Sequence, residues 1–137
     1  MRIERLYRYP VKGLTPEALE QVAVETGRAL PWDRAFALAH GDAKLDPAAP
    51  TWLPKQNFMC LMADAAIAAL RSSFNDRTGM LTIIDPHGAI EANVLATEGR
   101  LRIAAYLAAF LGPAARGTPH FLHLPGHVFS DSRAPVI

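Results

Sequence analysis

Proline and glycine interrupt this chain so often that many short strands are favoured over a bundle of helices. The 137 residues include 11 prolines and 9 glycines, which divide the chain into short segments. Proline lacks the N–H that a strand ladder or a helix interior needs, and glycine releases the backbone at turns. A chain of this length suits one domain that buries a core. We therefore expect a mainly β fold.

The composition excludes several classes of protein. Hydrophobic residues make up 50% and charged residues 20% of the chain, and the formal net charge is only +1. This balance is unlike that of disordered chains or basic nucleic-acid-binding domains. Charges interrupt the apolar runs near the N-terminus, so we expect neither a secretory signal nor a membrane span. The lone cysteine, Cys60, fits a reducing compartment. Together, these features predict a soluble cytoplasmic protein without nucleic-acid or membrane partners.

Alternation of side chains in the first twelve residues predicts an opening strand. Its expected inner face carries Ile3, Tyr7, Tyr9 and Val11, and its outer face carries Arg2, Glu4, Arg8 and Lys12. Successive side chains of a strand point to opposite faces. Pro10 cannot donate to a central ladder and Gly13 releases the backbone, so the strand should end near Lys12 on an edge or rim.

Further extended segments complete the predicted β structure. They are Gln21–Glu25, Asp33–His40, Phe58–Met62, Arg71–Asn75, Met80–Asp85 and His120–Leu124. The glycine at position 79 predicts a hairpin with a bulge between residues 71 and 85. Residues 46–54 hold three prolines and are expected to form an irregular loop.

Two helical segments are expected. Asp64 can cap an alanine-rich turn that runs through Leu70. A C-terminal amphipathic helix should run from about Glu98 to Leu111, with Thr97 as its cap and Gly112-Pro113 as its stop. The stripe expected to lie against the sheet comprises Leu101, Ala105, Ala108 and Leu111. The predicted architecture is therefore a small closed or partly open β-barrel with a short helical turn and one C-terminal helix.

Lys12 and Arg34 are the main candidates for ligand binding. Each lies next to a turn or the start of a strand, and a small barrel brings such ends together at one mouth. Two converging cations would bind an anion such as phosphate, through a point charge and a bidentate fork. The alternative, which residue types alone favour, is that Arg34 pairs with Asp33 or another carboxylate while Lys12 is a solvated rim charge. Lys55 either extends the same mouth or marks a solvated strand entrance.

His120, His123 and His127 are spaced like metal ligands, but their setting argues against a metal site. Residues three apart on a strand face opposite ways, and Pro125-Gly126 would break a helix that aligned them. A closed zinc site also needs four ligands, so a metal-binding tail is the weakest interpretation. Cys60 is expected to be a core residue rather than a nucleophile. The chain carries no common catalytic fingerprint, and no catalytic residue is predicted.

Three short motifs, taken in order, resemble a known family. They are Tyr9-Pro10-Val11-Lys12-Gly13, then Leu30-x-x-Asp33-Arg34-x-Phe36-Ala37-Leu38, then Lys55-Gln56 before an apolar run. Together they resemble the N-terminal β-barrel domain of MOSC proteins, the molybdenum-cofactor sulfurase C-terminal family. The run Phe129-Ser130-Asp131-Ser132-x-x-Pro135-Val136 resembles the opening of the MOSC domain proper. The resemblance implies a barrel domain over residues 1–128, with residues 129–137 as the start of a truncated or absent MOSC domain.

The resemblance also implies a cofactor site. Lys12 and Arg34 would bind the phosphate of the molybdenum cofactor, and Lys55 stands where the family often has arginine. Gly13 stands where the family usually has serine, so only its backbone N–H remains to bind. The metal-binding or sulfur-carrying cysteine of the family belongs to the MOSC domain, and Cys60 does not match it.

The predicted function is that of a cofactor-anchoring domain, not catalytic alone, in a MOSC protein that acts as a sulfur carrier or an oxidoreductase. Its expected partner is the MOSC domain in cis or a separate partner protein. The alternative, from a different class, is a stand-alone non-catalytic module that binds a phosphorylated ligand or a partner protein.

Overall fold

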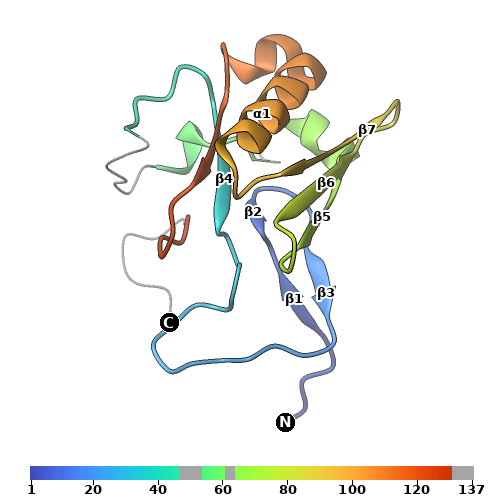
Figure 1. Ribbon diagram of the computed structural model, residues 1–137, viewed down its shortest axis with the longest axis vertical. Helices are drawn as coiled ribbons and strands as arrows, with labels where there is room; N and C mark the ends of the chain where they lie inside the picture. Colours follow the sequence, from blue (N-terminus) through green and yellow to red (C-terminus); the bar gives the residue numbers. More distant parts are fainter. Residues whose placement is uncertain (47–53, 61–63, 131–137) are drawn as a thin grey trace.

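Short strands dominate the described part of this computed structural model, which covers residues 1–46, 54–60 and 64–130. The strands are β1 (Leu6–Arg8), β2 (Val11–Lys12), β3 (Glu17–Leu19), β4 (Phe36–Ala39), β5 (Arg71–Asn75), β6 (Met80–Ile84), β7 (Ala89–Asn93) and β8 (His120–His123). The helices are the 3-10 helices η1 (Lys55–Asn57), η2 (Ala65–Ala69) and η3 (Gly112–Ala115), and the α-helix α1 (Thr97–Leu111). The mainly β class, with a short helical turn and a C-terminal helix, is confirmed (Figure 1).

Pairing among the described strands forms three sheets. β1 pairs with β3, β4 lies between β2 and β8, and β6 lies between β5 and β7. β2 runs parallel to β4, and the other pairs are antiparallel. Figure 1 shows α1 across one end of the two larger sheets, while residues 20–35 run around the opposite end.

The predicted opening strand is divided at Tyr9-Pro10 into β1 and β2, and its predicted faces are wrong around this division, although Val11 is buried as expected. Arg8 and Lys12 are buried, each 7% exposed, whereas Tyr7 and Tyr9 are exposed. The division follows from the partners of the two halves. β1 pairs with β3, but at Tyr9 and Pro10 the carbonyl oxygens accept hydrogen bonds from the segment that enters β4. A change of partner changes which face is covered, so one alternating pattern cannot describe both halves.

The strand predicted over Gln21–Glu25 is also wrong. The chain forms β3 earlier, at Glu17–Leu19, and residues 21–25 carry no strand. The register of β3 places Glu17 opposite Arg8, where the two side chains form an ion pair at 3.0 Å. Valines in an alternating pattern do not make a strand without a partner to bury them, and Val24 is exposed.

The sheet β5-β6-β7 is built from strands that follow one another along the chain and pair through short turns. The predicted hairpin is confirmed: β5 and β6 pair from Arg71↔Ile84 to Asn75↔Met80, and Gly79 has the positive φ of 79° that the turn requires. β7, which was not among the predicted strands, follows the turn at residues 86–88 and completes a meander.

The C-terminal helix is confirmed, but its predicted cap is wrong, and of its predicted buried stripe only Leu111 is buried. The cap position is Ala96, and Thr97 begins the helix. The buried residues are Gly99, Ile103, Ala104, Leu107 and Leu111, whereas Leu101 is 65% exposed. Gly99 explains the rotation, because a Cβ atom there would lie 1.7 Å from the Asn93 carbonyl oxygen at the end of β7. Within the described ranges, no helix has the length and apolar character that a membrane span requires.

Two predicted strands lie next to β4, and only one of them forms. β8 confirms the strand predicted at His120–Leu124. The strand predicted at Phe58–Met62 is reduced to a single bridge between Phe58 and Ala39, and residues 61 and 62 lie outside the described residues. The helical turn after Asp64 is confirmed, but the Asp64 side chain does not cap it.

Both faces of β4 are buried, and they face different apolar clusters. Phe36 and Leu38 belong to the main core, which lies between the sheets and α1. Ala37 and Ala39 belong to a second cluster, completed by Phe58, Leu122 and Phe129. The period of two in a strand divides the residues between the clusters. Packing on both faces therefore holds β4 in place, and β4 in turn pairs with β2, which carries Lys12.

Candidate functional site

The turn that leads into β4 has an unusual backbone. Trp32 and Arg34 have φ angles of 64° and 49°, in the left-handed region that residues other than glycine rarely adopt. Such conformations cost about 1–3 kcal/mol each and persist only where the surroundings impose them. The Trp32 ring packs 5.1 Å from the Phe74 ring and 6.1 Å from the Phe36 ring, between centroids. Core packing thus holds Arg34 in a strained turn, as is common at ligand sites.

Asp33 binds on both sides of this turn. Its Oδ1 accepts a hydrogen bond from the Tyr9 backbone N–H at 2.8 Å. Its Oδ2 accepts from Arg34 Nε at 2.9 Å and lies 2.8 Å from Arg34 Nη2. The pairing of Arg34 with Asp33, one of the two sequence alternatives, is therefore present. It uses two of the three guanidinium nitrogens, and the Arg34 side chain remains 33% exposed.

Lys12 is a buried cation rather than a solvated rim charge. Its ammonium donates a hydrogen bond to the Phe129 carbonyl oxygen at 3.4 Å and lies 5.5 Å from the centroid of the Phe58 ring. Phe58 and Phe129 both belong to the second apolar cluster. A buried charge needs such partners because the loss of hydration is costly.

One residue connects the two candidate cations. The Phe129 carbonyl oxygen accepts the hydrogen bond from the Lys12 ammonium, and the Phe129 N–H donates to the Arg34 carbonyl oxygen at 3.0 Å. The Arg34 N–H in turn donates to the Tyr9 carbonyl oxygen at 2.5 Å. Lys12 and Arg34 therefore belong to one junction, which joins β2, the entry to β4 and the chain after β8. Whether both cations bind one anion stays a prediction.

Gly13 cannot be replaced by the serine of the family without a change in structure. Its φ is +87°, and a Cβ atom there would lie 2.6 Å from the Met59 carbonyl oxygen. The turn closes with a hydrogen bond of 3.1 Å from the Leu14 N–H to the Val11 carbonyl oxygen. The backbone of residues 59 and 60 thus occupies the space a serine side chain would need. Lys55 begins η1, and its side chain lies outside the description.

A buried histidine and carboxylate near the end of β4 were missed. His40 is 2% exposed, and its Nε2 lies 3.4 Å from Asp64 Oδ2. The same Asp64 oxygen accepts a hydrogen bond from the Cys60 backbone N–H, also at 3.4 Å. Among the described residues, His40 Nδ1 has no hydrogen-bond partner. Continuing the alternation of β4 to position 40 would have indicated a buried histidine, but no local signal indicated Asp64.

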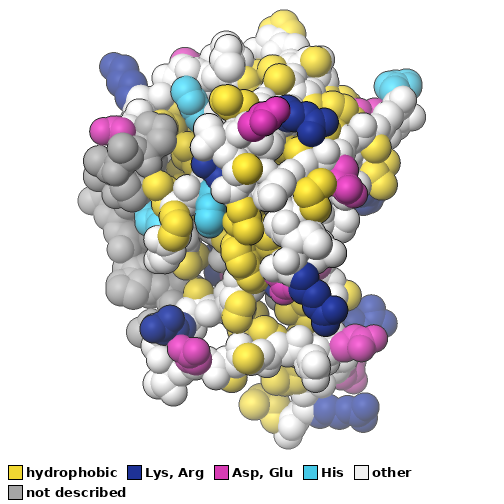
Figure 2. All heavy atoms as spheres, viewed as in Figure 1, with side chains coloured by type: hydrophobic (Ala, Val, Ile, Leu, Met, Phe, Trp, Pro, Cys, Tyr) yellow, Lys and Arg dark blue, Asp and Glu magenta, His cyan; other side chains and the backbone are white. Residues whose placement is uncertain are grey.

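The predicted histidine pattern does not form a metal site among the described residues, which contain no group of three or more metal-ligating side chains. His123 packs on Phe36, 4.8 Å between ring centroids, and its pKa is lowered by burial and by the charge of Arg100. His127 packs on Phe129 at 4.7 Å, and burial also lowers its pKa. Both imidazoles are therefore neutral near pH 7. Figure 2 shows histidines on the side of β4 and β8 and no large cluster of basic side chains on the visible face.

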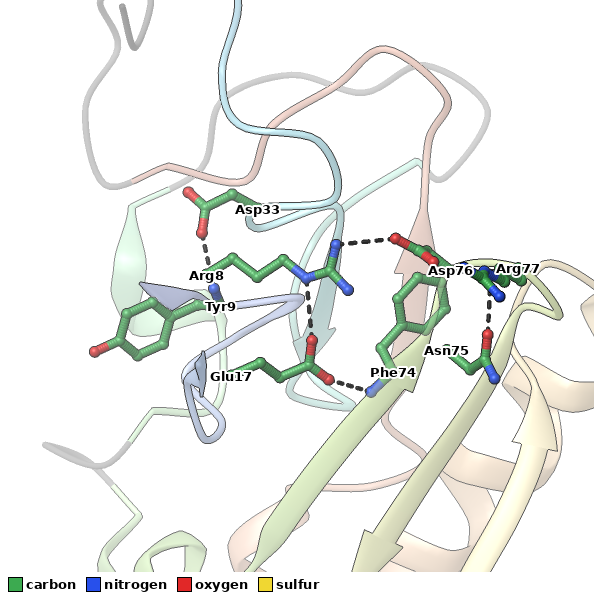
Figure 3. Close-up of polar contacts among 8 residues, drawn as sticks. All are labelled: Arg8, Tyr9, Glu17, Asp33, Phe74, Asn75, Asp76 and Arg77. Carbon is green, nitrogen blue, oxygen red and sulfur yellow. Dashed lines mark hydrogen bonds and ion pairs between the residues drawn. The ribbon is translucent and has the colours of Figure 1, made fainter. Parts of the chain in front are cut away.

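A second polar network links the β1-β3 pair to the β5-β6 hairpin (Figure 3). Arg8 donates from Nε to Glu17 at 3.0 Å and from Nη1 to Asp76 at 3.3 Å. The other Glu17 oxygen accepts the Phe74 backbone N–H, and Thr15 Oγ1 accepts the Ser72 backbone N–H at 2.8 Å. These side chains bind the outer N–H groups of β5, so they protect a sheet edge. The network is structural, and the alternation of side chains did not indicate it, because that pattern places Arg8 on the outer face of the opening strand.

Comparison with known proteins identifies the family. A family model described as the MOSC N-terminal beta barrel domain matches residues 1–112, from the N-terminus through α1. No curated protein and no solved structure matches the chain significantly. The matched region contains both β2 with Lys12 and the strained turn with Arg34. The chain therefore belongs to the MOSC N-terminal β-barrel domain family.

Proposed function

We propose that this chain anchors the molybdenum cofactor in a MOSC protein, with Arg34 and Lys12 as ligands of the cofactor phosphate. The observation that carries the proposal is the junction at Phe129, which holds the Arg34 backbone and the Lys12 ammonium on one residue. A strained backbone conformation at Arg34 adds support, since such strain is often found at binding sites.

The donor set suits a phosphate. Arginine and lysine form charge-assisted hydrogen bonds to phosphate oxygens, and the Gly13 N–H adds a neutral donor nearby. Arg34 is accessible and has a guanidinium nitrogen outside its pair with Asp33. Lys12 is 7% exposed, so it reaches an anion only if the residues over it move. Lys55 is proposed as a further ligand from its sequence position alone.

The domain would position the cofactor rather than react with the substrate. When bound, the molybdenum cofactor supplies the redox or sulfur-transfer centre, so the whole protein would be an oxidoreductase or a sulfur carrier. The MOSC domain, in cis or as a partner protein, would cover the cofactor. Exposed Tyr7 and Tyr9 on and next to β1 provide apolar surface for such a partner. We propose a cytoplasmic location, in keeping with the lone thiol of Cys60.

Titration of the chain with inorganic phosphate, followed by NMR, tests the anchoring site. We expect the Arg34 Nε–H signal to shift, and Arg34→Ala to weaken binding at least about tenfold because one charge-assisted contact is lost. Arg28→Ala is the matched control. Arg28 also pairs with a neighbouring carboxylate, Glu25, at 3.0 Å, but its side chain is exposed and takes no part in the contacts of the junction described above. Equal phosphate affinity in Arg34→Ala and wild type would contradict the proposal.

The alternative is a non-catalytic module that binds a partner protein through the exposed tyrosines. Tyr7 lies opposite the exposed Ala18 in the β1-β3 pair, so the two form one accessible face. Analytical ultracentrifugation over a range of concentrations tests self-association through this face. Association that Tyr7→Ser abolishes, in a chain that binds no phosphate, would favour the alternative.

A further inference from the structure

We propose that Asp33 is a positioning residue, which fixes the Arg34 guanidinium so that one of its edges is free to bind two oxygens of the anion. This role rests on the proposed function, because it concerns how Arg34 binds phosphate. It also implies specificity. A fixed, planar fork matches a tetrahedral oxyanion such as phosphate better than a spherical anion such as chloride.

Asp33 holds the guanidinium along one edge only. Its Oδ2 accepts a hydrogen bond from Arg34 Nε at 2.9 Å and lies 2.8 Å from Arg34 Nη2. The Arg34 side chain forms no other polar contact within the described ranges, so Nη1 and the outer N–H of Nη2 remain available. These groups form the end of the planar fork, where parallel N–H bonds match two oxygens of a phosphate. The edge that is held and the edge that would bind are therefore different.

The other Asp33 oxygen attaches this arrangement to the strand that carries Lys12. Oδ1 accepts the Tyr9 N–H at 2.8 Å (Figure 3), and the Arg34 N–H donates to the Tyr9 carbonyl oxygen at 2.5 Å. Tyr9 lies just before β2, which contains Lys12. Asp33 is 9% exposed, so little water competes for these hydrogen bonds. One carboxylate thus sets the position of the Arg34 fork relative to β2.

The left-handed backbone at Arg34 brings the carboxylate onto the guanidinium. Neighbouring residues in an extended chain direct their side chains to opposite sides, so Asp33 and Arg34 would point apart in an ordinary strand. Arg34 instead has a φ of 49°, and the two side chains meet. The unfavourable backbone conformation therefore serves this pair.

Asp33→Asn separates positioning from simple electrostatics, because the two predict changes of opposite sign. A carboxylate beside an anion site repels the anion, so its removal alone would tighten phosphate binding. Positioning predicts weaker binding. The amide offers one acceptor oxygen to the donors of Tyr9 and Arg34, and its NH2 group would face one of them. A released fork must be ordered again on binding, which should weaken phosphate binding about three- to tenfold.

Titration with sodium phosphate, followed by NMR of the arginine side chains, is the test. In wild type at low temperature the Nη protons of Arg34 should give separate signals, because Asp33 binds two of its nitrogens and stops rotation of the guanidinium. Asp33→Asn should average these signals and weaken binding. Asp42→Asn is the matched control, since it removes a carboxylate 3.3 Å from Arg116 Nε and leaves the contacts of the junction in place. Phosphate affinity should not change in this control.

Phosphate affinity in folded Asp33→Asn that equals or exceeds that of wild type would overturn the positioning role and leave anchoring by Arg34 intact. If Asp33→Asn does not fold, wild type decides. Averaged Nη signals before phosphate is added, or equal affinities for phosphate and chloride, would overturn the role. Absence of phosphate binding in both wild type and Asp42→Asn would instead refute the anchoring function itself.

Discussion

The sheet β5-β6-β7 with α1 and the junction of β2 with β4 are built from contacts of different range. Strands β5, β6 and β7 follow one another along the chain and pair through short turns, and α1 begins four residues after β7. The junction depends on Asp33 with Tyr9, 24 residues apart, and on Lys12 with Phe129, 117 residues apart. Local contacts need little loop closure, whereas distant ones form only when the rest of the chain is in place.

The two regions also treat charge differently. The outer face of the hairpin sheet keeps its charged groups exposed, as in the pair of Thr82 with Glu91. The N-terminal region buries Arg8, Lys12 and Asp33, and each of them has at least one partner 24 or more residues away along the chain. A buried charge is costly to leave unpaired, so these residues make the N-terminal region sensitive to single substitutions.

The largest effect is expected from Glu17→Ala in the Arg8 network. The change leaves a buried guanidinium without its nearest carboxylate and the Phe74 N–H without its acceptor. We expect the free energy of unfolding to fall by about 3–5 kcal/mol, measured by urea denaturation. Glu25→Ala breaks the exposed pair with Arg28 and should cost at most about 1 kcal/mol. A similar small cost at both positions would remove the contrast between the regions.

Gly13→Ser should follow in size. The substitution combines a left-handed backbone at φ +87° with a Cβ atom 2.6 Å from the Met59 carbonyl oxygen. We expect a loss of about 2–3 kcal/mol in the free energy of unfolding from strain and overpacking. Gly27→Ser is the matched control, since its φ is +76° but no atom lies within 4 Å of an added Cβ. Gly27→Ser should cost about 1 kcal/mol, and equal losses would refute the close approach at Gly13.

A smaller, pH-dependent effect is expected from Tyr106→Phe, which removes the hydrogen bond from α1 to Asp85 in the β6-β7 turn. That bond lowers the pKa of Asp85, so its contribution is present above the ordinary pKa of 3.8 and is lost as the pH falls through the lowered value. It also raises the pKa of Tyr106 from 10.0 to about 12, so the contribution is lost as the pH rises through that interval. The difference in melting temperature between variant and wild type should be constant from pH 5 to 9, as roughly bounded by these two pKa values, and should shrink at both extremes. A difference independent of pH would contradict the assigned bond.

The smallest effect is expected from Leu101→Gln on the outer face of α1. Leu101 is exposed, so the free energy of unfolding should change by less than about 0.5 kcal/mol. Leu107→Ala, on the buried face of the same helix, should cost about 2–5 kcal/mol by leaving a cavity. A larger loss at Leu101 than at Leu107 would mean that α1 packs with the stripe expected from sequence alone.

The sequence singled out Lys12 and Arg34 as candidates, but it could not predict how the residues around them are arranged. The motifs around Lys12 and Arg34 identified the family, and the family model covers both. Residue types could not show that Lys12 is buried under Phe129 or that Asp33 divides its oxygens between Tyr9 and Arg34. Nor could they reveal the His40–Asp64 pair. Its members come together because backbone hydrogen bonds join residues 38 and 40 to residues 57 and 59.

By itself, the sequence determined the class of the fold, the hairpin at Gly79, the strand β8 and the extent of α1. Each depends on neighbours within a few residues: a turn glycine, an apolar run, or a glycine and proline that end a helix. Only the tertiary structure decided which face of β1 and of α1 is buried, where β3 forms, and what covers Lys12. Those outcomes depend on which distant segment becomes the partner, and the periodicity of one segment carries no information about that choice.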